Sequence, residues 1–187
     1  NWDYKRKFTS SSVAGYNFDA LADNIYIFNK DTLITYNLYS GDVRYDTFTN
    51  ECPMDIFLGT NFLDGKTNKL YVYEAQAEVA GKPTIATLDL YTKEWSIMSY
   101  ESLPMQLHHH SAAYDQTNER HFIFGGFGDI YYSKELYMYN YNKNRQDAVA
   151  LKGKQIAPRY FSSMGYREDN NSLYIYGGMG NESGEQI

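Results

Sequence analysis

The chain has 187 residues, a formal net charge of −6 and a single cysteine, Cys52, which excludes an intrachain disulfide and a zinc site built on two or more thiolates. The acidic balance argues against a nucleic-acid partner, because phosphate contacts require clustered Lys and Arg. No apolar run approaches the roughly 18 residues of a membrane span, and the polar residues 1–8 do not resemble a signal peptide.

One short pattern recurs four times along the chain. Each copy has a turn rich in Asp, Asn or Gly followed by four alternating apolar and aromatic residues, and the copies begin 45, 51 and 52 residues apart. They lie at 24–28, 69–73, 120–124 and 172–176. Spacings this similar indicate an internal repeat, which must be recognised before any fold is assigned.

Each copy is accompanied by further predicted strands at constant offsets. An aromatic residue precedes the copies by seven to nine positions, at Tyr16, Phe62, Tyr114 and Tyr166. A second strand pattern follows at 33–38, 85–90 and 136–141, ending in a polar turn, and a shorter strand comes after the turn. Short β-branched and aromatic segments separated by such turns predict an all-β meander of about four strands per repeat. The aromatic share of 17% supplies large rings to fill the space between facing sheets.

The second half of the chain resembles the kelch repeat. The residues that carry the resemblance are the double glycines Gly125-Gly126 and Gly177-Gly178, the run 110–113 before the third copy, Pro158-Arg159 before the fourth, and Trp95 after the second. In that family each repeat of about 50 residues forms one blade of a β-propeller. The resemblance implies a kelch-like β-propeller segment of four-stranded antiparallel blades, with repeats at about 8–52, 53–104, 105–156 and a truncated 157–187.

The double glycines need a physical reason, because each Gly costs about 0.5–1 kcal/mol of strand stability relative to Ala. We expect a neighbouring backbone or ring to approach too closely for a Cβ atom.

At about 51 residues per repeat the chain supplies roughly 3.7 units, whereas propellers of this kind typically have about six or seven blades. An open arc would leave aromatic sheet faces and unpaired strands in water. We therefore expect the remaining blades to lie in the same protein, or a second copy of the chain to cover the open faces; the first is the favoured interpretation.

The residues 108–110 form a histidine run that could ligate a metal. If the run lies on a strand, His108 and His110 share one side, but a third ligand must come from elsewhere. The resemblance makes His110 structural. We therefore expect no metal and no other cofactor.

Propellers recognise ligands through loops that converge at one end of the blades. The resemblance implies a recognition face made by the connections between second and third strands and by those between blades. The candidate ligand-binding residues are His108, His109, Phe127, Asp129, Tyr131, Tyr132, Arg159, Tyr160, Asn181 and Glu182. Exposed rings beside Asn, Asp and Arg would suit sugar rings and peptide side chains equally well.

The sequence therefore favours a non-catalytic binding module for a glycan or a protein partner, within a larger protein. The alternative is part of a carbohydrate-active propeller enzyme: a mutarotase or epimerase using Arg159 with Glu182 or Glu185 as acid–base partners, or a galactose-oxidase-like copper enzyme. The latter needs a cysteine crosslinked to a tyrosine, and Cys52 lies outside any aligned motif. The sequence favours neither the cytoplasm nor an exported location.

Overall fold

The computed structural model describes residues 7–8, 13–56, 60–74, 81–101, 108–128 and 130–186. Within them the chain forms 14 strands and one 3-10 helix, and no helix is long and apolar enough to cross a membrane. The strands form three four-stranded antiparallel sheets and one two-stranded sheet, which we call blades 1 to 4 in chain order. The all-β fold expected from the sequence is thus confirmed.

Every complete blade is a simple meander in which neighbouring strands follow one another in sequence. Blade 1 comprises β1 (Gly15–Asp19), β2 (Asn24–Phe28), β3 (Thr32–Asn37) and β4 (Val43–Thr47). Blade 2 comprises β5 (Thr60–Asp64), β6 (Lys69–Tyr73), β7 (Ile85–Asp89) and β8 (Trp95–Ser99). Blade 3 comprises β9 (Ser111–Asp115), β10 (Arg120–Phe124), β11 (Leu136–Asn140) and β12 (Arg145–Ala148).

Blade 4 has only two strands, β13 (Arg159–Arg167) and β14 (Ser172–Gly180), joined by the 3-10 helix η1 (Glu168–Asn170). Both strands have nine residues, compared with four to six in the other blades. Within the described residues β14 pairs with β13 alone, so its other edge carries unpaired backbone groups. The described part of the fourth repeat therefore has two strands, and we call it the half-blade.

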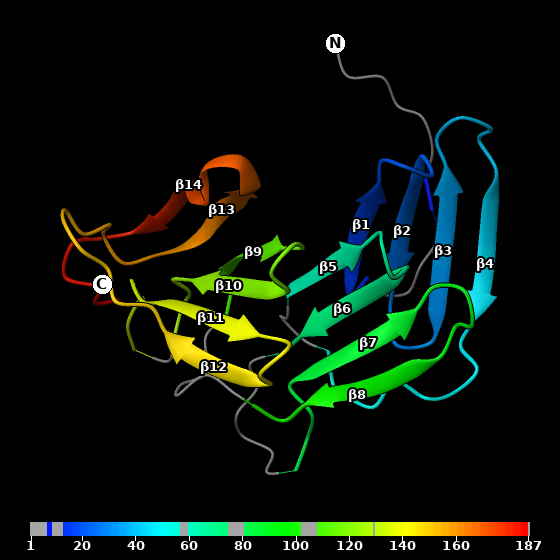
Figure 1. Cartoon of the computed structure of the whole chain (residues 1–187), viewed down its shortest axis with the longest axis horizontal. Coiled ribbons are helices and arrows are strands. Elements are labelled where there is room, and N and C mark those ends of the chain that lie inside the picture. The colour runs from blue at the N-terminus through cyan, green and yellow to red at the C-terminus, as the bar shows by residue number, and fades with distance from the viewer. Residues whose placement is uncertain are drawn as a thin grey trace.

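The blades fan out side by side, with the first strand of each blade on the inner side of the arc and the last on the outer side (Figure 1). Consecutive first strands contact one another, β1 with β5, β5 with β9 and β9 with β13. This arrangement around a common axis is that of a propeller. Sheets stacked face to face as a sandwich would not bring successive first strands together.

The same turn builds the first hairpin of the complete blades. The first strand ends in Asp, and its carboxylate accepts hydrogen bonds from backbone N–H groups of the turn, as Asp19 does from Leu21 at 2.9 Å and Asp115 from Asn118 at 3.1 Å. The last turn residue has a positive φ of 50–56° in all four blades; these residues are Asp23, Asn68, Glu119 and Asn171. The polar turns recognised in the sequence therefore have a specific geometry.

Three packed junctions connect the four blades. Junction 1/2 buries mainly aliphatic residues with Trp95, and junction 2/3 buries Tyr73, Ile123, Tyr139 and Tyr141. Junction 3/4 has a smaller buried set, and the blade 4 residues packed on it are only partly buried. The aromatic residues thus fill the wedges between sheets, as expected.

Candidate functional site

Antiparallel connectivity places two kinds of connection at the same end of the blades: those between second and third strands, and those between blades. We call this the loop end, and the opposite end, with the tight turns, the turn end. At the loop end of blades 3 and 4, His108 and Phe127 exchange two backbone hydrogen bonds of 2.8 Å, and Phe127 also pairs with Tyr132. The N–H of Gly126 donates to the carbonyl of Arg159 at 2.8 Å. Three segments far apart in sequence are therefore joined through their backbones.

A fourth segment, residues 181–186, joins the same unit. The backbone N–H of Tyr132 donates to the carbonyl of Gly184, and the Gln186 side chain donates to the carbonyl of Gly128 at 2.9 Å. Asn181 shapes this segment, because its side chain accepts a bond from the N–H of Gly184 and donates to the carbonyl of Glu185, both at 2.7 Å. Asn181 therefore has a structural role at the loop end.

Five rings pack together on this backbone framework, and we call them the ring cluster: His109, Phe127, Tyr132, Tyr160 and Phe161. The Tyr160 ring lies 5.1 Å from Tyr132 in a stacked arrangement and 5.5 Å from Phe127. The rings of His109 and Phe161 lie 4.2 Å apart. The cluster spans the junction of blades 3 and 4 and has one strongly exposed member, Phe161, at 60%.

His109 and Phe161 both adopt the left-handed backbone conformation, each with a φ of 54°. The N–H of Phe161 donates to the carbonyl of His109 at 3.0 Å, so the two strained residues hold one another. His adopts this conformation more readily than most residues, but a bulky residue such as Phe161 with positive φ is a genuine outlier whose cost the surrounding structure must offset. Such residues concentrate at ligand clamps and active sites, and this observation singles out Phe161.

The double glycines contribute to the same geometry. Gly125 has a φ of 68°, and a Cβ atom on it would overlap the carbonyl oxygen of Arg159. The close approach expected from the sequence is therefore correct for Gly125. Gly177 has a similar φ of 69°, but a Cβ there would meet open space, so the backbone conformation alone requires this glycine.

The structure gathers several of the predicted ligand-binding residues into one unit. His108, His109, Phe127, Tyr132 and Tyr160 all lie in or against the ring cluster. Tyr131 is 42% exposed and pairs with Glu185. Glu182, three residues before Glu185, is also exposed. Asp129 lies outside the described residues.

Sequence reasoning missed Phe161. The available signal was its position 52 residues after His109, the same offset that separates the two double glycines. Its importance depends on a gap in the pairing of β13: Tyr160 pairs with Met179 and Ser162 with Gly177 in one register, but Phe161 between them is unpaired and donates its N–H to His109 instead. That break is a property of the backbone, and the residue type alone does not predict it.

The histidine run does not have the strand geometry on which the metal hypothesis depended. The strand β9 begins at Ser111, and the positive φ of His109 breaks the expected alternation of sides. Desolvation, with a smaller contribution from the neighbouring His108, lowers the pKa of His109. Within the described residues no group of three or more His, Cys, Asp and Glu side chains is placed to hold a metal ion.

Arg159 does not contact the carboxylates with which the enzyme hypothesis pairs it. Its guanidinium donates to the backbone carbonyls of Ala157 at 3.0 Å and Gly177 at 2.8 Å. Over the described part of the chain it forms no ion pair with Glu182 or Glu185. Arg159 therefore connects β13 to β14 rather than forming an acid–base pair.

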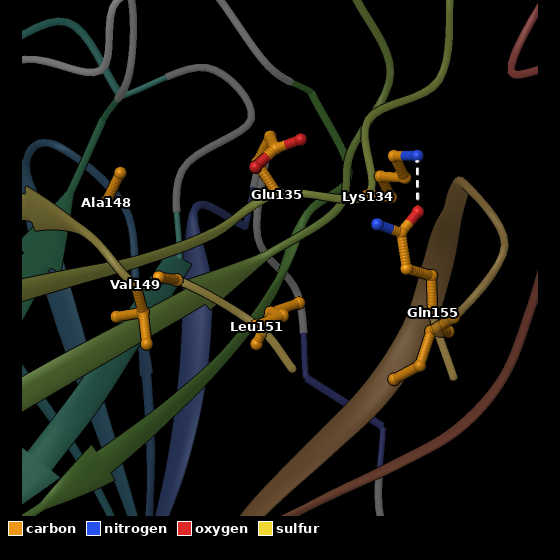
Figure 2. Close-up of a pocket in the computed structure, with 8 residues that line it drawn as sticks. Lys134, Glu135, Ala148, Val149, Leu151 and Gln155 are labelled. Atoms are coloured by element: carbon orange, nitrogen blue, oxygen red, sulfur yellow. Dashed lines mark hydrogen bonds between the residues drawn. The ribbon is translucent and has the colours of Figure 1, made fainter. Parts of the chain in front are cut away.

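Junction 3/4 contains a cavity of about 590 Å³, lined by apolar residues of both blades, among them Phe122, Leu136, Leu173 and Ile175. A smaller pocket of about 280 Å³ adjoins it (Figure 2). At its rim the Lys134 ammonium donates to the Gln155 side chain at 2.7 Å. These hollows lie beside the half-blade, where the complete blades have their third and fourth strands.

Comparison with known proteins agrees with this architecture. Among solved structures, "Structure of YjhT" superposes with a TM-score of 0.61 at 13% sequence identity, covering 87% of this chain and 57% of that one. The chain thus spans little more than half the length of that neighbour, and the likeness shows the fold alone. No curated protein matches. The family model described as the KLHDC2/KLHL20/DRC7 Kelch-repeats domain matches residues 54–186. With most of its length covered by that model, the chain belongs to the Kelch-repeat family.

Proposed function

We propose that the chain is a non-catalytic binding module that recognises a protein partner through the ring cluster and the loops around it. The Kelch-repeat propeller fold suggests a binding or interaction module. The observation that carries the proposal is the pair His109 and Phe161, held in a strained conformation that displays the Phe161 ring at the surface. Strain of this kind is retained where function offsets its cost.

A protein partner fits the ring cluster better than a glycan does. Tyr132 and Tyr160 stack on one another, so those ring faces are occupied rather than offered to a sugar. Large apolar side chains nearby are exposed, including Ile130, Tyr131, Phe161 and Met179. Rigid exposed aromatic side chains are the usual anchors of protein interfaces.

We further propose that the chain works within a larger propeller whose remaining blades belong to the same protein. The half-blade 4, the unpaired edge of β14 and the apolar cavity beside it support this proposal. The longer YjhT chain supports it too. Completion by a second copy of the chain is the competing arrangement, and a mass measurement on the natural product distinguishes the two.

The binding proposal is tested by panning a displayed random-peptide library, and in parallel a glycan array, against the wild-type chain and matched variants. Phe161→Ala and Tyr131→Ala should weaken capture of the selected peptides at least tenfold, about 1.4 kcal/mol. Tyr39→Ala, which removes an exposed ring at the turn end, should leave capture unchanged.

Two outcomes would overturn the proposal. The first is peptide capture that is equal in the wild type and both loop-end variants. The second is saturable glycan binding that the same two variants abolish, which would assign the ring cluster to a sugar. Thermal unfolding of each variant establishes that lost capture does not reflect lost folding.

A further inference from the structure

A further cavity, of about 420 Å³, lies between blades 1 and 2 at the turn end, away from the ring cluster. Blade 1 lines it with side chains from β2, β3, β4 and the turn before β4, and blade 2 lines it with two of its tight turns. Its volume falls within the range of about 300–1,000 Å³ that is typical of small-molecule sites. Its lining is rich in amide, hydroxyl and charged groups, unlike that of the cavity at junction 3/4.

One replacement distinguishes the wall of this cavity from the corresponding place in junction 2/3. Leu90 and Tyr141 are equivalent, because each follows the third strand of its blade and donates its backbone N–H, at 3.0 Å, to the last residue of the first turn. Tyr141 is buried and packs edge-on against the rings of Tyr71 and Tyr114, 5.1 and 6.0 Å away. Leu90 is smaller and leaves the corresponding space open.

The amides in the cavity are held in fixed orientations. Asn37 uses its whole side chain, donating to Asn24 at 2.9 Å and to the carbonyl of Ala22 at 3.1 Å while accepting from two backbone N–H groups. Asn24 in turn donates to the Tyr26 hydroxyl at 3.3 Å. Since that hydroxyl oxygen accepts this bond, its proton is available to a ligand, as are the second N–H and lone pair of Asn24.

Thr35, on the same wall, has a buried hydroxyl that makes no hydrogen bond to any described part of the chain. Leaving a buried polar group unpaired costs about 1–3 kcal/mol. Because this oxygen is inaccessible from the cavity, it does not contact a ligand there, and Thr35 contributes other atoms to the wall. The uncharged groups that can bond a ligand are therefore the Asn24 amide and the Tyr26 hydroxyl.

The charged groups at the cavity are balanced, with one carboxylate from Asp42 and one guanidinium from Arg44. Arg44 uses its Nε to bond Asp46 at 2.8 Å, which leaves its terminal N–H groups for a ligand. The Tyr91 ring stands at the rim and is 87% exposed. A balanced donor and acceptor set selects neither an anion nor a cation, and a free aromatic face suits the C–H face of a sugar ring.

We propose that this cavity binds a neutral pyranose unit of a glycan. The Asn24 amide and the Tyr26 hydroxyl bond the sugar hydroxyls, and the Tyr91 ring stacks on the apolar face. The site lies at the opposite end of the blades from the ring cluster. The chain thus has two independent recognition surfaces of different chemistry.

The test is saturation-transfer NMR with the methyl glycosides of glucose, galactose and mannose, titrated against the whole chain. We expect at least one of these to bind with a dissociation constant on the order of 1 mM. Leu90→Tyr, which introduces the ring that junction 2/3 has at this place, should abolish the signal. Tyr91→Ala should weaken binding about tenfold, whereas Tyr39→Ala, the equivalent exposed ring one blade earlier and outside the cavity, should not change it.

Thr35→Val is a matched control in the cavity wall, because it keeps the side-chain shape and removes only the inaccessible hydroxyl. It should leave sugar binding unchanged and the unfolding temperature unchanged or higher. Absence of transfer to all three glycosides would overturn the proposal, as would equal binding in the wild type and Leu90→Tyr. Phe161→Ala leaves this cavity intact, so it should not change sugar binding. The sugar-site proposal and the ring-cluster proposal can therefore fail independently of one another.

Discussion

Junctions 2/3 and 3/4 are built from the same repeat and differ in how far they close. At junction 2/3, rings and aliphatic side chains of two complete blades bury Tyr73, Ile123 and Tyr139 almost completely. At junction 3/4 the two-stranded blade leaves Leu173 and Ile175 partly exposed beside a cavity of about 590 Å³. The comparison indicates that the third strand of a blade, more than its first two, seals the wedge against the preceding blade.

The largest expected effect comes from removing a ring at the closed junction. Tyr139→Ala deletes a fully buried ring that packs 4.8 Å from Tyr141, and should lower the free energy of unfolding by about 4 kcal/mol. Tyr166→Ala, the matched change at the open junction, should cost about 1 kcal/mol, because that ring is only half-buried. Urea unfolding of the two variants measures the difference. Equal losses would contradict the distinction between the junctions.

The closed junction also makes stability depend on pH through a buried histidine. Burial, with a smaller contribution from His110, lowers the pKa of His121 from 6.5 to about 3. The unfolded chain therefore binds this proton more tightly than the folded chain does, so protonation favours unfolding. The free energy of unfolding keeps its full value above pH 6.5 and decreases as the pH falls toward 3. Between pH 7 and pH 4.5 the loss should be about 2.5 kcal/mol. Chemical unfolding at a series of pH values measures it.

His121→Phe should flatten this pH dependence, since the phenyl ring carries no proton. His109→Gln, at the open junction, should leave most of the pH dependence of the unfolding free energy in place, because His109 is only half-buried. The carboxylates with lowered pKa, such as Asp64 and Asp115, lose their contribution only as the pH falls below about 4. An unchanged slope in His121→Phe would show that another group is responsible.

Much of this architecture follows from the sequence, because strands with period-2 patterns and polar turns at regular spacing encode their own hairpins. The four copies of the pattern predict four sheets, and the structure has one sheet at each copy. The loop-end residues His109, Phe127 and Tyr160 lie together, since their positions between strands fix the end of the blade at which they lie.

The sequence could not predict features that depend on the backbone path. The left-handed conformation of Phe161 arises from a break in strand pairing that has no residue signature. The cavity beside Leu90 becomes visible only when the residue is compared with the equivalent Tyr141 inside a packed junction. The local sequence pattern predicts the strands and turns. The exposure of a side chain and the presence of a cavity depend instead on how the strands pack.

A third prediction sharpens the comparison at the loop end, where the backbones of blades 3 and 4 are in direct contact although the same junction contains a cavity. Gly125→Ala adds a Cβ that overlaps the Arg159 carbonyl as well as straining a φ of 68°, and should cost about 2 kcal/mol or more. Gly177→Ala strains nearly the same φ without an overlap and should cost about 1 kcal/mol. The difference between the two losses of unfolding free energy measures the cost of the overlap with the Arg159 carbonyl. If the two losses are equal, blade 4 moves aside at no cost.

The smallest expected effect compares two tyrosine hydroxyls. In the closed junction the Tyr139 hydroxyl donates to Asn144, and in the open junction the Tyr166 hydroxyl donates to Asn171 at 2.8 Å. Tyr139→Phe should cost about 1 kcal/mol because Asn144 loses its donor in a partly buried site, whereas water replaces the hydroxyl beside Asn171 and limits the cost of Tyr166→Phe to about 0.5 kcal/mol or less. Paired urea titrations resolve this difference. If Tyr166→Phe costs as much as Tyr139→Phe, the open junction excludes water as well as the closed one does, and the cavity beside the half-blade is sealed in solution.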